Sequence, residues 1–141
     1  MVASQAEPPT FATLNKAQCA SLTTFRKNGA AVATPVWFAE HGGIIYIDSL
    51  AHTGKVKRIR HTARVTLAPC TFGGAITGPT MECRARIVSD PQEMKVAEAA
   101  LAHKYFPIRW IYYSLSALWR AIRRKAEPPS VYIAVDPIFI E

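Results

Sequence analysis

The stretch FRKNGAAVATPVWF at residues 25–38 carries the clearest fold signal in this chain. Asn28-Gly29, at its centre, is the strongest short-range signal for a β-hairpin turn, and it predicts strands at residues 25–27 and 31–38. Pro35 lies inside the second of these strands. Because proline has no backbone N–H, that strand is either a plain edge strand or one whose backbone faces a ligand or a bulge.

Short strands are also predicted on both sides of this hairpin. Apolar and β-branched residues follow the turn His41-Gly42-Gly43, and the alternation of apolar and polar residues continues further along the chain. The Gly-rich stretch 73–78 is interpreted as a hairpin connection. The additional strands are predicted at residues 44–47, 63–68, 80–88 and 131–135.

Helices are predicted before the strands and in the last third of the chain. Asn15 is a suitable cap for a short helix at residues 15–21. Asp90 followed by Pro91 indicates the start of another helix, and a second one runs from 108 to about 124. The order is therefore helix, about four antiparallel strands, helices and a last strand. Without regular βαβ alternation, this order predicts a mainly β fold, a small antiparallel barrel with helices packed outside.

Composition limits the class of protein. The chain has 141 residues, of which 50% are apolar and 19% charged, so we expect a single domain over residues 1–141 with a real core. Residues 1–12 are expected to form a loose arm and 107–126 an amphipathic helix insert. No signal peptide is visible in residues 1–9, and three cysteines without a C-x-x-C pair argue against a disulfide scaffold. We therefore expect a cytoplasmic protein with no metal site.

The positive charge is concentrated in two places. The chain has 17 lysines and arginines against 10 acidic residues, a net charge of +7, which predicts an anionic partner. Nine of the basic residues form two clusters, and the rest of the chain is close to neutral. The first cluster is Lys55, Lys57, Arg58, Arg60 and Arg64, and the second is Arg120, Arg123, Arg124 and Lys125.

The first cluster coincides with a predicted helix start directly after a strand. Thr53 is a suitable N-cap, and Val56 and Ile59 have the spacing of a buried helix face. Lys55 lies in the first turn, where the helix dipole disfavours cations. A solvated basic face is the ordinary explanation. We favour a phosphate site, because the junction concentrates free amides and cations at one point.

Three residues of the second cluster, Arg120, Arg123 and Arg124, lie on the amphipathic helix predicted at residues 108–124. Its apolar residues recur every three or four positions, which is typical of a helix that covers a core, and this is the expectation here. Attachment to a membrane surface is the alternative, since Trp110, Trp119 and three tyrosines lie nearby. The apolar stripe consists of Ile108, Ile111, Tyr112, Leu115, Leu118, Trp119 and Ile122.

No catalytic residue can be assigned from the sequence. The chain contains no G-x-S-x-G, H-E-x-x-H or G-x-G-x-x-G motif, and its four histidines lack ligand spacing. Tyr46, Asp48 and His52 could each have a purely structural role.

Taken in order, these segments resemble the split β-barrel flavin and deazaflavin oxidoreductases, the superfamily of pyridoxamine 5′-phosphate oxidase. The branch that uses the deazaflavin coenzyme F-420 is the most similar. The resemblance covers residues 14–105 and the last strand. It rests on residues 23–29, 33–38, 43–47, 53–59, 63–70 and 78–85.

The resemblance implies a homodimer with cofactors in grooves at the interface. It implies that the cofactor ring lies against the strand that bears Pro35 and that the phosphate lies at the helix start. One departure is Ala33, where the oxidase has an arginine. This counts against pyridoxamine phosphate oxidation and weakens the case for flavin mononucleotide (FMN). The implied cofactor-binding residues are Thr34, Pro35, Val36, Ser49, Thr53, Gly54, Lys55, Lys57 and Arg58.

The implied function is hydride transfer from reduced F-420 to a small organic electrophile. An FMN-dependent oxidoreductase or flavin carrier of the same fold is the first alternative. A barrel that binds nucleic acid or a membrane surface is an alternative of another class, and its nucleic-acid form predicts aromatic residues interleaved with Lys and Arg on a strand face. Basic residues such as Arg60 or Arg64 could meet the polyglutamate tail of F-420.

Overall fold

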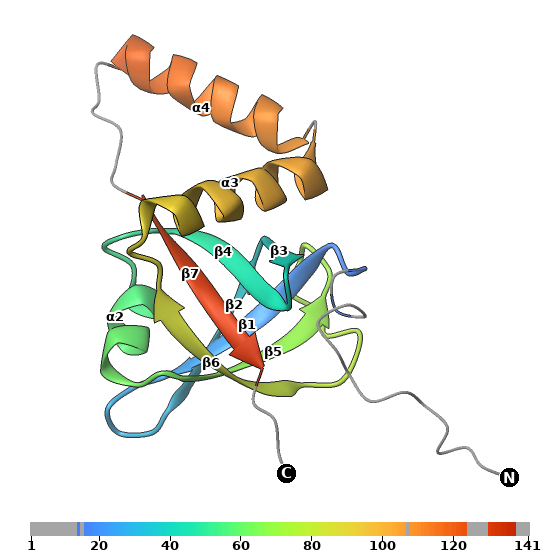
Figure 1. Cartoon of the computed structure of the whole chain (residues 1–141), viewed down its shortest axis with the longest axis vertical. Helices are drawn as coiled ribbons and strands as arrows, with labels where there is room; N and C mark the ends of the chain where they lie inside the picture. Colours follow the sequence, from blue (N-terminus) through green and yellow to red (C-terminus); the bar gives the residue numbers. More distant parts are fainter. Residues whose placement is uncertain (1–13, 15, 107, 124–129, 138–141) are drawn as a thin grey trace, which may run out of the picture.

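A seven-stranded antiparallel sheet dominates the structure (Figure 1). The computed structural model describes residues 14, 16–106, 108–123 and 130–137. The strands are β1 (Cys19–Phe25), β2 (Ala31–Val36), β3 (Phe38–His41), β4 (Ile44–Leu50), β5 (Arg64–Cys70), β6 (Met81–Ile87) and β7 (Ser130–Pro137). The helices are α2 (Gly54–His61), α3 (Pro91–Tyr105) and α4 (Ile108–Arg123). The sheet curls into a half-barrel, and this confirms the predicted split β-barrel class.

The strand order explains how the barrel curls. It is β2-β1-β5-β6-β7-β4-β3, so β2 and β3 lie at opposite edges although they are consecutive in the chain. Trp37 is the one residue between them, and the chain passes there from one edge of the sheet to the other. The single strand predicted at 31–38 is therefore wrong: the curl of the sheet divides it at Trp37. Pro35 lies on edge strand β2, where its missing N–H leaves no ladder bond unmade.

One other predicted element is wrong and several are confirmed. The predicted helix at 15–21 overlaps β1, which begins at Cys19 and pairs with both β2 and β5. Strand pairing on both sides outweighs a weak local capping signal. The proposed cap Asn15 and the arm at 1–12 lie outside the described residues. The Asn28-Gly29 turn is confirmed, and Gly29 has a φ of 87°, which favours glycine.

The barrel core lies between the inner face of the sheet and α2. Phe38, Leu22 and Ile47 are fully buried in it, together with Val56 from α2. A second packing layer lies outside the sheet, where α3 covers β3 and β4. Val56 and Ile59 are buried as their spacing predicts, so the core fixes which side of α2 faces solvent.

Tyr105 connects α3 to two other parts of the fold. Its hydroxyl accepts a hydrogen bond from the Phe38 backbone N–H at 3.0 Å and donates one to the Gln18 carbonyl at 2.8 Å. Its ring stacks on Trp37, with a centroid distance of 4.9 Å. This side chain therefore holds the corner between β2 and β3 against α3.

Replacing Tyr105 with phenylalanine should lower the free energy of unfolding by about 1–3 kcal/mol, because the buried Phe38 N–H loses its acceptor. Urea unfolding followed by circular dichroism measures this loss. Tyr112→Phe on α4 is the control, since Tyr112 is 57% exposed and should change the value by less than about 0.5 kcal/mol. Equal losses in both variants would contradict the role given to Tyr105.

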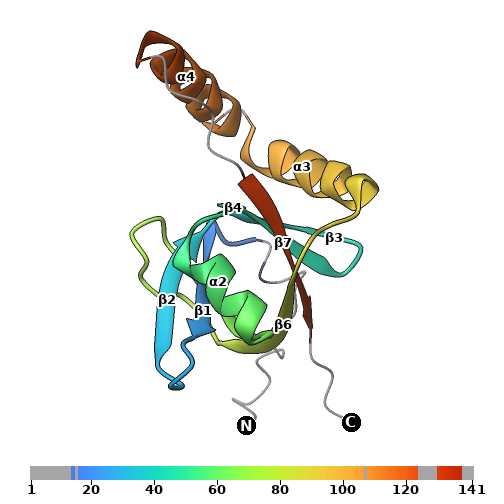
Figure 2. The ribbon, with the colours of Figure 1, turned by 90° about the vertical axis from the view of Figure 1, so that its left-hand side faces the viewer.

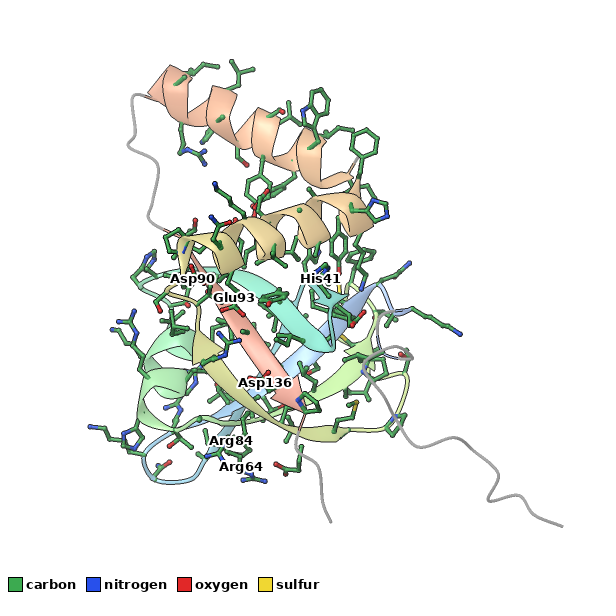
Figure 3. All side chains as sticks on the ribbon, viewed as in Figure 1. His41, Arg64, Arg84, Asp90, Glu93 and Asp136 are labelled. Atoms are coloured by element: carbon green, nitrogen blue, oxygen red, sulfur yellow. The ribbon has the colours of Figure 1, made fainter. Side chains whose placement is uncertain are left out.

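An ion pair fixes the start of α3 to the barrel. Arg86 donates two hydrogen bonds to the Glu93 carboxylate, at 2.6 and 2.7 Å, and the Tyr46 hydroxyl donates a third at 2.8 Å. These hydrogen bonds lower the pKa of Glu93, and those from Arg86 have the largest effect. Burial and the bond to Glu93 raise the pKa of Tyr46 to about 12. Figure 3 shows Glu93 near Asp90, the N-cap of α3 that the sequence predicts.

This network makes part of the stability depend on pH. A carboxylate whose pKa is lowered in the folded state stabilises the fold at any pH above its unfolded pKa, which is near 4.5 for Glu93. This stabilisation is lost as the pH falls through the lower pKa that the carboxylate has in the folded state. Glu93→Gln should therefore cost about 1 kcal/mol at pH 7 and much less in acid. Urea titrations at both pH values test this. Glu82→Gln is the control, because the Arg64–Glu82 pair is exposed to solvent and should contribute little to the free energy of unfolding.

Helix α4 extends away from the barrel beyond α3 (Figure 2). Its apolar stripe, expected to cover a core, is exposed: Ile111 is 46%, Leu115 61%, Leu118 57% and Ile122 68% accessible. The expectation is wrong because the helix presents its polar side to the barrel, where Tyr113 donates a hydrogen bond to Asp48. Among the described residues, no helix is both long and apolar enough to cross a bilayer.

Candidate cofactor site

The start of α2 has backbone amides that no side chain caps. Thr53 occupies the N-cap position with an extended backbone, as the sequence predicts, but its side chain makes no capping bond. The Thr53 hydroxyl instead donates to the Leu50 carbonyl at 3.0 Å and lies 3.0 Å from Ser49 Oγ. No acidic residue occupies the first turn. Within the described part of the chain, neither the Thr53 side chain nor an acidic residue of the first turn caps these N–H groups, an arrangement that suits an external anion.

Arg58 folds back over this first turn. A Cβ at position 54 would lie 2.5 Å from Nη1 of Arg58, so glycine is what lets the guanidinium approach the helix start. Arg58 Nε also donates to Thr24 Oγ1 at 2.6 Å, which ties α2 to β1. The guanidinium therefore adds planar, charged donors to the amides of Gly54 and its neighbours.

Lys55 adds a second cation at the same place. Burial, followed by repulsion from Arg58, lowers the pKa of Lys55, and attraction to Asp48 opposes this shift. The Lys55 ammonium is therefore partly buried near Arg58, and Asp48 is the nearby anion. A bound phosphate would add counter-charge at a helix start where the dipole otherwise disfavours cations.

A cavity of about 390 Å³ opens beside this helix start, between α2 and the β1–β2 turn. We call it the α2 pocket. It contains three of the residues implied by the resemblance, Gly54, Lys57 and Arg58, and four that the sequence reasoning missed. The missed residues are Phe25, Arg26, Lys27 and His61. A basic pair directly before the Asn28-Gly29 turn was the available signal, since the turn folds that pair towards α2.

No residue of β2 lines the α2 pocket. Thr34 is half-buried and Pro35 exposed, whereas the Val36 side chain belongs to the core at 7% exposure. Any flat ligand against this strand would therefore meet the backbone of Val36. Gly74 from the β5–β6 connection approaches the Pro35 ring, and a Cβ there would lie 3.5 Å from it.

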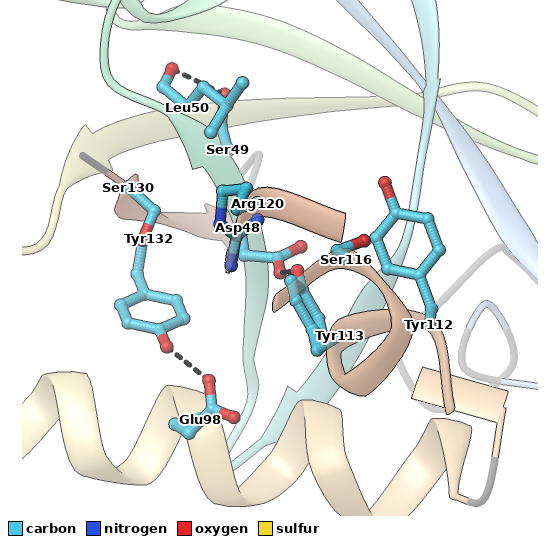
Figure 4. Close-up of a pocket in the computed structure, with 10 residues that line it drawn as sticks. All are labelled: Asp48, Ser49, Leu50, Glu98, Tyr112, Tyr113, Ser116, Arg120, Ser130 and Tyr132. Atoms are coloured by element: carbon cyan, nitrogen blue, oxygen red, sulfur yellow. Dashed lines mark hydrogen bonds between the residues drawn. The ribbon is translucent and has the colours of Figure 1, made fainter. Parts of the chain in front are cut away.

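A second cavity, of about 560 Å³, lies between α4, α3 and the ends of β4 and β7 (Figure 4). We call it the α4 pocket. Ser49 lines this pocket while its hydroxyl lies 3.0 Å from Thr53 Oγ1 at the start of α2, and Lys57 and Arg58 line the α2 pocket. Tyr113 donates a hydrogen bond to Asp48 and Tyr132 donates one to Glu98 (Figure 4). The lining is Asp48, Ser49, Leu50, Glu98, Tyr112, Tyr113, Ser116, Arg120, Ser130 and Tyr132.

Tyr46 and Asp48, two titratable residues that the sequence offered, are both engaged by other side chains, whereas His61 lines the α2 pocket. Tyr46 is engaged by Glu93, and its pKa of about 12 keeps it protonated. Asp48 accepts a hydrogen bond from Tyr113. Among residues 14, 16–106, 108–123 and 130–137, no group of three His, Cys, Asp or Glu side chains is placed to hold a metal ion.

The half-barrel defines a split-barrel protein, and the cationic start of α2 lies beside one of its pockets. The chain belongs to the pyridoxamine 5′-phosphate oxidase family, whose model matches residues 8–137. This confirms the resemblance drawn from the sequence. No curated protein matches the sequence.

Solved structures show the same fold at low identity. A conserved hypothetical protein from Mycobacterium tuberculosis is 17% identical with a TM-score of 0.63, over 99% of this chain and 82% of that one. An F420 reductase is 18% identical with a TM-score of 0.57, over 94% of this chain and 97% of that one. A FAD-binding protein from Mesorhizobium loti is 16% identical with a TM-score of 0.60, over 89% of this chain and 83% of that one.

Proposed function

We propose that this protein is an oxidoreductase that uses reduced F-420 to deliver a hydride to a small organic electrophile. The observation that carries the proposal is the uncapped start of α2, where amides, Lys55 and Arg58 converge without an acidic residue. Membership of the oxidase family supports a phosphate-bearing flavin-like ligand, and the similarity to an F420 reductase supports the deazaflavin.

In this proposal, the residues at the start of α2 hold the cofactor phosphate. The amides after Thr53 and the side chains of Lys55 and Arg58 donate to its oxygens, and Lys57 adds charge. The residues fit the group chemically, because Lys55 and Arg58 lie at a helix start whose first turn has no acidic residue. Thr34, Pro35 and Val36 would support the ring, and Ser49 would contact the chain that links ring and phosphate.

The chain's own contribution to the reaction is binding, orientation and exclusion of water. When bound, reduced F-420 supplies the hydride. Pro35 presents a rigid, N–H-free surface on edge strand β2, and the β5–β6 connection around Gly74 covers one side of it. The β2 edge pairs only with β1 among the described residues, which leaves room for a second subunit to complete the groove. We therefore include a homodimer in the proposal. The cytoplasmic location expected from the sequence is also part of it.

Binding of FMN is the second candidate. The same phosphate site serves both cofactors, and the similarity to a FAD-binding protein favours a flavin. Ala33, where the resemblance implies an arginine, favours the deazaflavin.

Titration of the purified protein with F-420 and with FMN tests both candidates. We expect the F-420 fluorescence to be quenched with micromolar affinity and FMN to bind more weakly. A protein that is yellow as purified would overturn the preference for F-420. If neither cofactor binds at micromolar concentration, the proposed function is wrong. Light scattering on the same sample tests the dimer, which a monomeric mass with cofactor bound would exclude.

A further inference from the structure

Cys19 and Cys70 lie directly opposite each other across two paired strands. Cys19 is the first residue of β1 and Cys70 the last of β5, and the antiparallel register pairs them. Both side chains are buried, and both are free thiols. Opposite residues in such a pair share one face of the sheet, with Cα atoms about 4.5–5.5 Å apart. A disulfide spans Cα atoms about 4.4–6.8 Å apart, so these two thiols are within reach of one.

The third cysteine has no thiol opposite it. Cys83 on β6 is fully buried, and the residues that pair with it are Val65 on β5 and Pro137 on β7. The three cysteines therefore differ in their neighbours rather than in their burial. Cys83 is a matched control for chemistry that needs two adjacent thiols.

The end of α3 places a buried amine near this pair. Lys104 Nζ lies 3.4 Å from the centre of the Phe38 ring, and within the described part of the chain it has no hydrogen-bond partner. Burial, followed by Cys70, raises the pKa of the Cys19 thiol, and the charge of Lys104 opposes this shift. Burial raises the pKa of Cys70 without such opposition. Cys19 is therefore the better nucleophile of the two, because the thiolate is the reactive species.

We propose that Cys19 and Cys70 form a reversible disulfide when the protein meets a peroxide. The Cys19 thiolate attacks one oxygen of hydrogen peroxide, which breaks the O–O bond, gives a sulfenic acid on Cys19 and releases hydroxide. Cys70 then attacks that sulfur, and the sulfenic hydroxyl leaves as water. In total, the two thiols lose two electrons and two protons, and one hydrogen peroxide becomes two water molecules. This proposal does not depend on the cofactor or on the proposed function.

The disulfide would tie the start of β1 to the end of β5. Cys70 is the last residue before the β5–β6 connection, in which Gly74 lies against the Pro35 ring of β2. Ile76 of the same connection pairs with Cys70. The bridge would therefore restrain the connection that covers part of the β2 edge. Reduction by another thiol would release it, so the pair is a redox-sensitive switch beside β2.

Thiol counting on the full chain tests this proposal. The reduced protein is treated with hydrogen peroxide, catalase removes the excess, and a maleimide labels the free thiols after unfolding in denaturant. We expect the count to fall from three to one, with Cys83 as the remaining thiol, and dithiothreitol to restore all three. Peptide mapping should find Cys19 joined to Cys70 within one chain.

Single variants separate the pair from the third cysteine. Cys19→Ala and Cys70→Ala should each abolish the disulfide, whereas Cys83→Ala should form it at the rate of the parent chain. Lys104→Met should slow its formation about tenfold, because the Cys19 thiolate loses a stabilising charge. Circular dichroism checks that each variant folds.

Three results would contradict these assignments. The parent chain could keep all three thiols at a peroxide concentration that oxidises free glutathione, which would overturn the proposal. Peptide mapping could place Cys83 in the disulfide or join two chains, and either result would overturn it too. Lys104→Met could form the disulfide as fast as the parent chain, which would contradict the role given to Lys104.

Discussion

Replacing Lys55 with alanine should weaken cofactor binding about 10- to 100-fold. Lys55 lies in the first turn of α2, partly buried beside Arg58 and without an acidic residue in that turn. A charge-assisted hydrogen bond to phosphate is worth about 1.5–3 kcal/mol, and this bond is lost with the ammonium. Fluorescence titration with F-420, and with FMN in parallel, measures the change.

The same substitution should leave the fold intact or stabilise it slightly. A cation in the first turn opposes the helix dipole, and alanine is the best helix former, so the free energy of unfolding should rise by up to about 1 kcal/mol. Weaker cofactor binding together with a higher free energy of unfolding would indicate that Lys55 serves ligand binding at a cost in stability. Lys95→Ala, an exposed lysine on α3, is the control and should change neither quantity. If Lys55→Ala bound both cofactors like the parent chain, the proposed phosphate site would be wrong.

Replacing Phe38 with alanine should lower the free energy of unfolding by about 3–5 kcal/mol. Phe38 is fully buried in the barrel core at the start of β3. Its removal takes away a large apolar side chain and leaves a cavity that the surrounding strands cannot fill. The Lys104 ammonium lies 3.4 Å from the centre of the Phe38 ring and would lose that contact too.

Urea unfolding at pH 7 measures this effect, and Phe72→Ala is the size-matched control. Phe72 is 50% exposed on the β5–β6 connection, so its removal should cost less than about 1 kcal/mol. Because domains of this size are stabilised by about 5–15 kcal/mol, Phe38→Ala should unfold at much lower urea concentration than the parent chain. A loss below about 1 kcal/mol would contradict the central place of Phe38 in the core.

The local elements were predictable where neighbouring residues decide them. Asn28-Gly29 adopts its turn because glycine tolerates the positive φ, whatever surrounds it. Asp90 caps α3 through its own side chain, which accepts from the Gln92 N–H at 3.0 Å. The start of α2 was also visible, because a strand end, a possible cap and a cluster of cations occur within a few residues.

Other features were not predictable because they depend on distant partners. The strand β1 covers part of the predicted 15–21 helix, since Cys19 pairs with Cys70 far along the chain. The corner at Trp37 exists only because the sheet curls and Tyr105 stacks against it. The basic residues Arg26 and Lys27 line the α2 pocket only because the β1–β2 hairpin lies against the helix.

By itself, the sequence determined the split-barrel class and placed a cationic helix start after the strand that ends near Ser49. These features depend on turn residues, alternation and capping, which act over a few residues. Only the tertiary structure decided which way α4 faces. An amphipathic helix has the same periodicity whether its apolar side is buried or exposed, and here Tyr113 and Asp48 bind its polar side to the barrel. The stripe that the sequence suggested for the core therefore faces outwards.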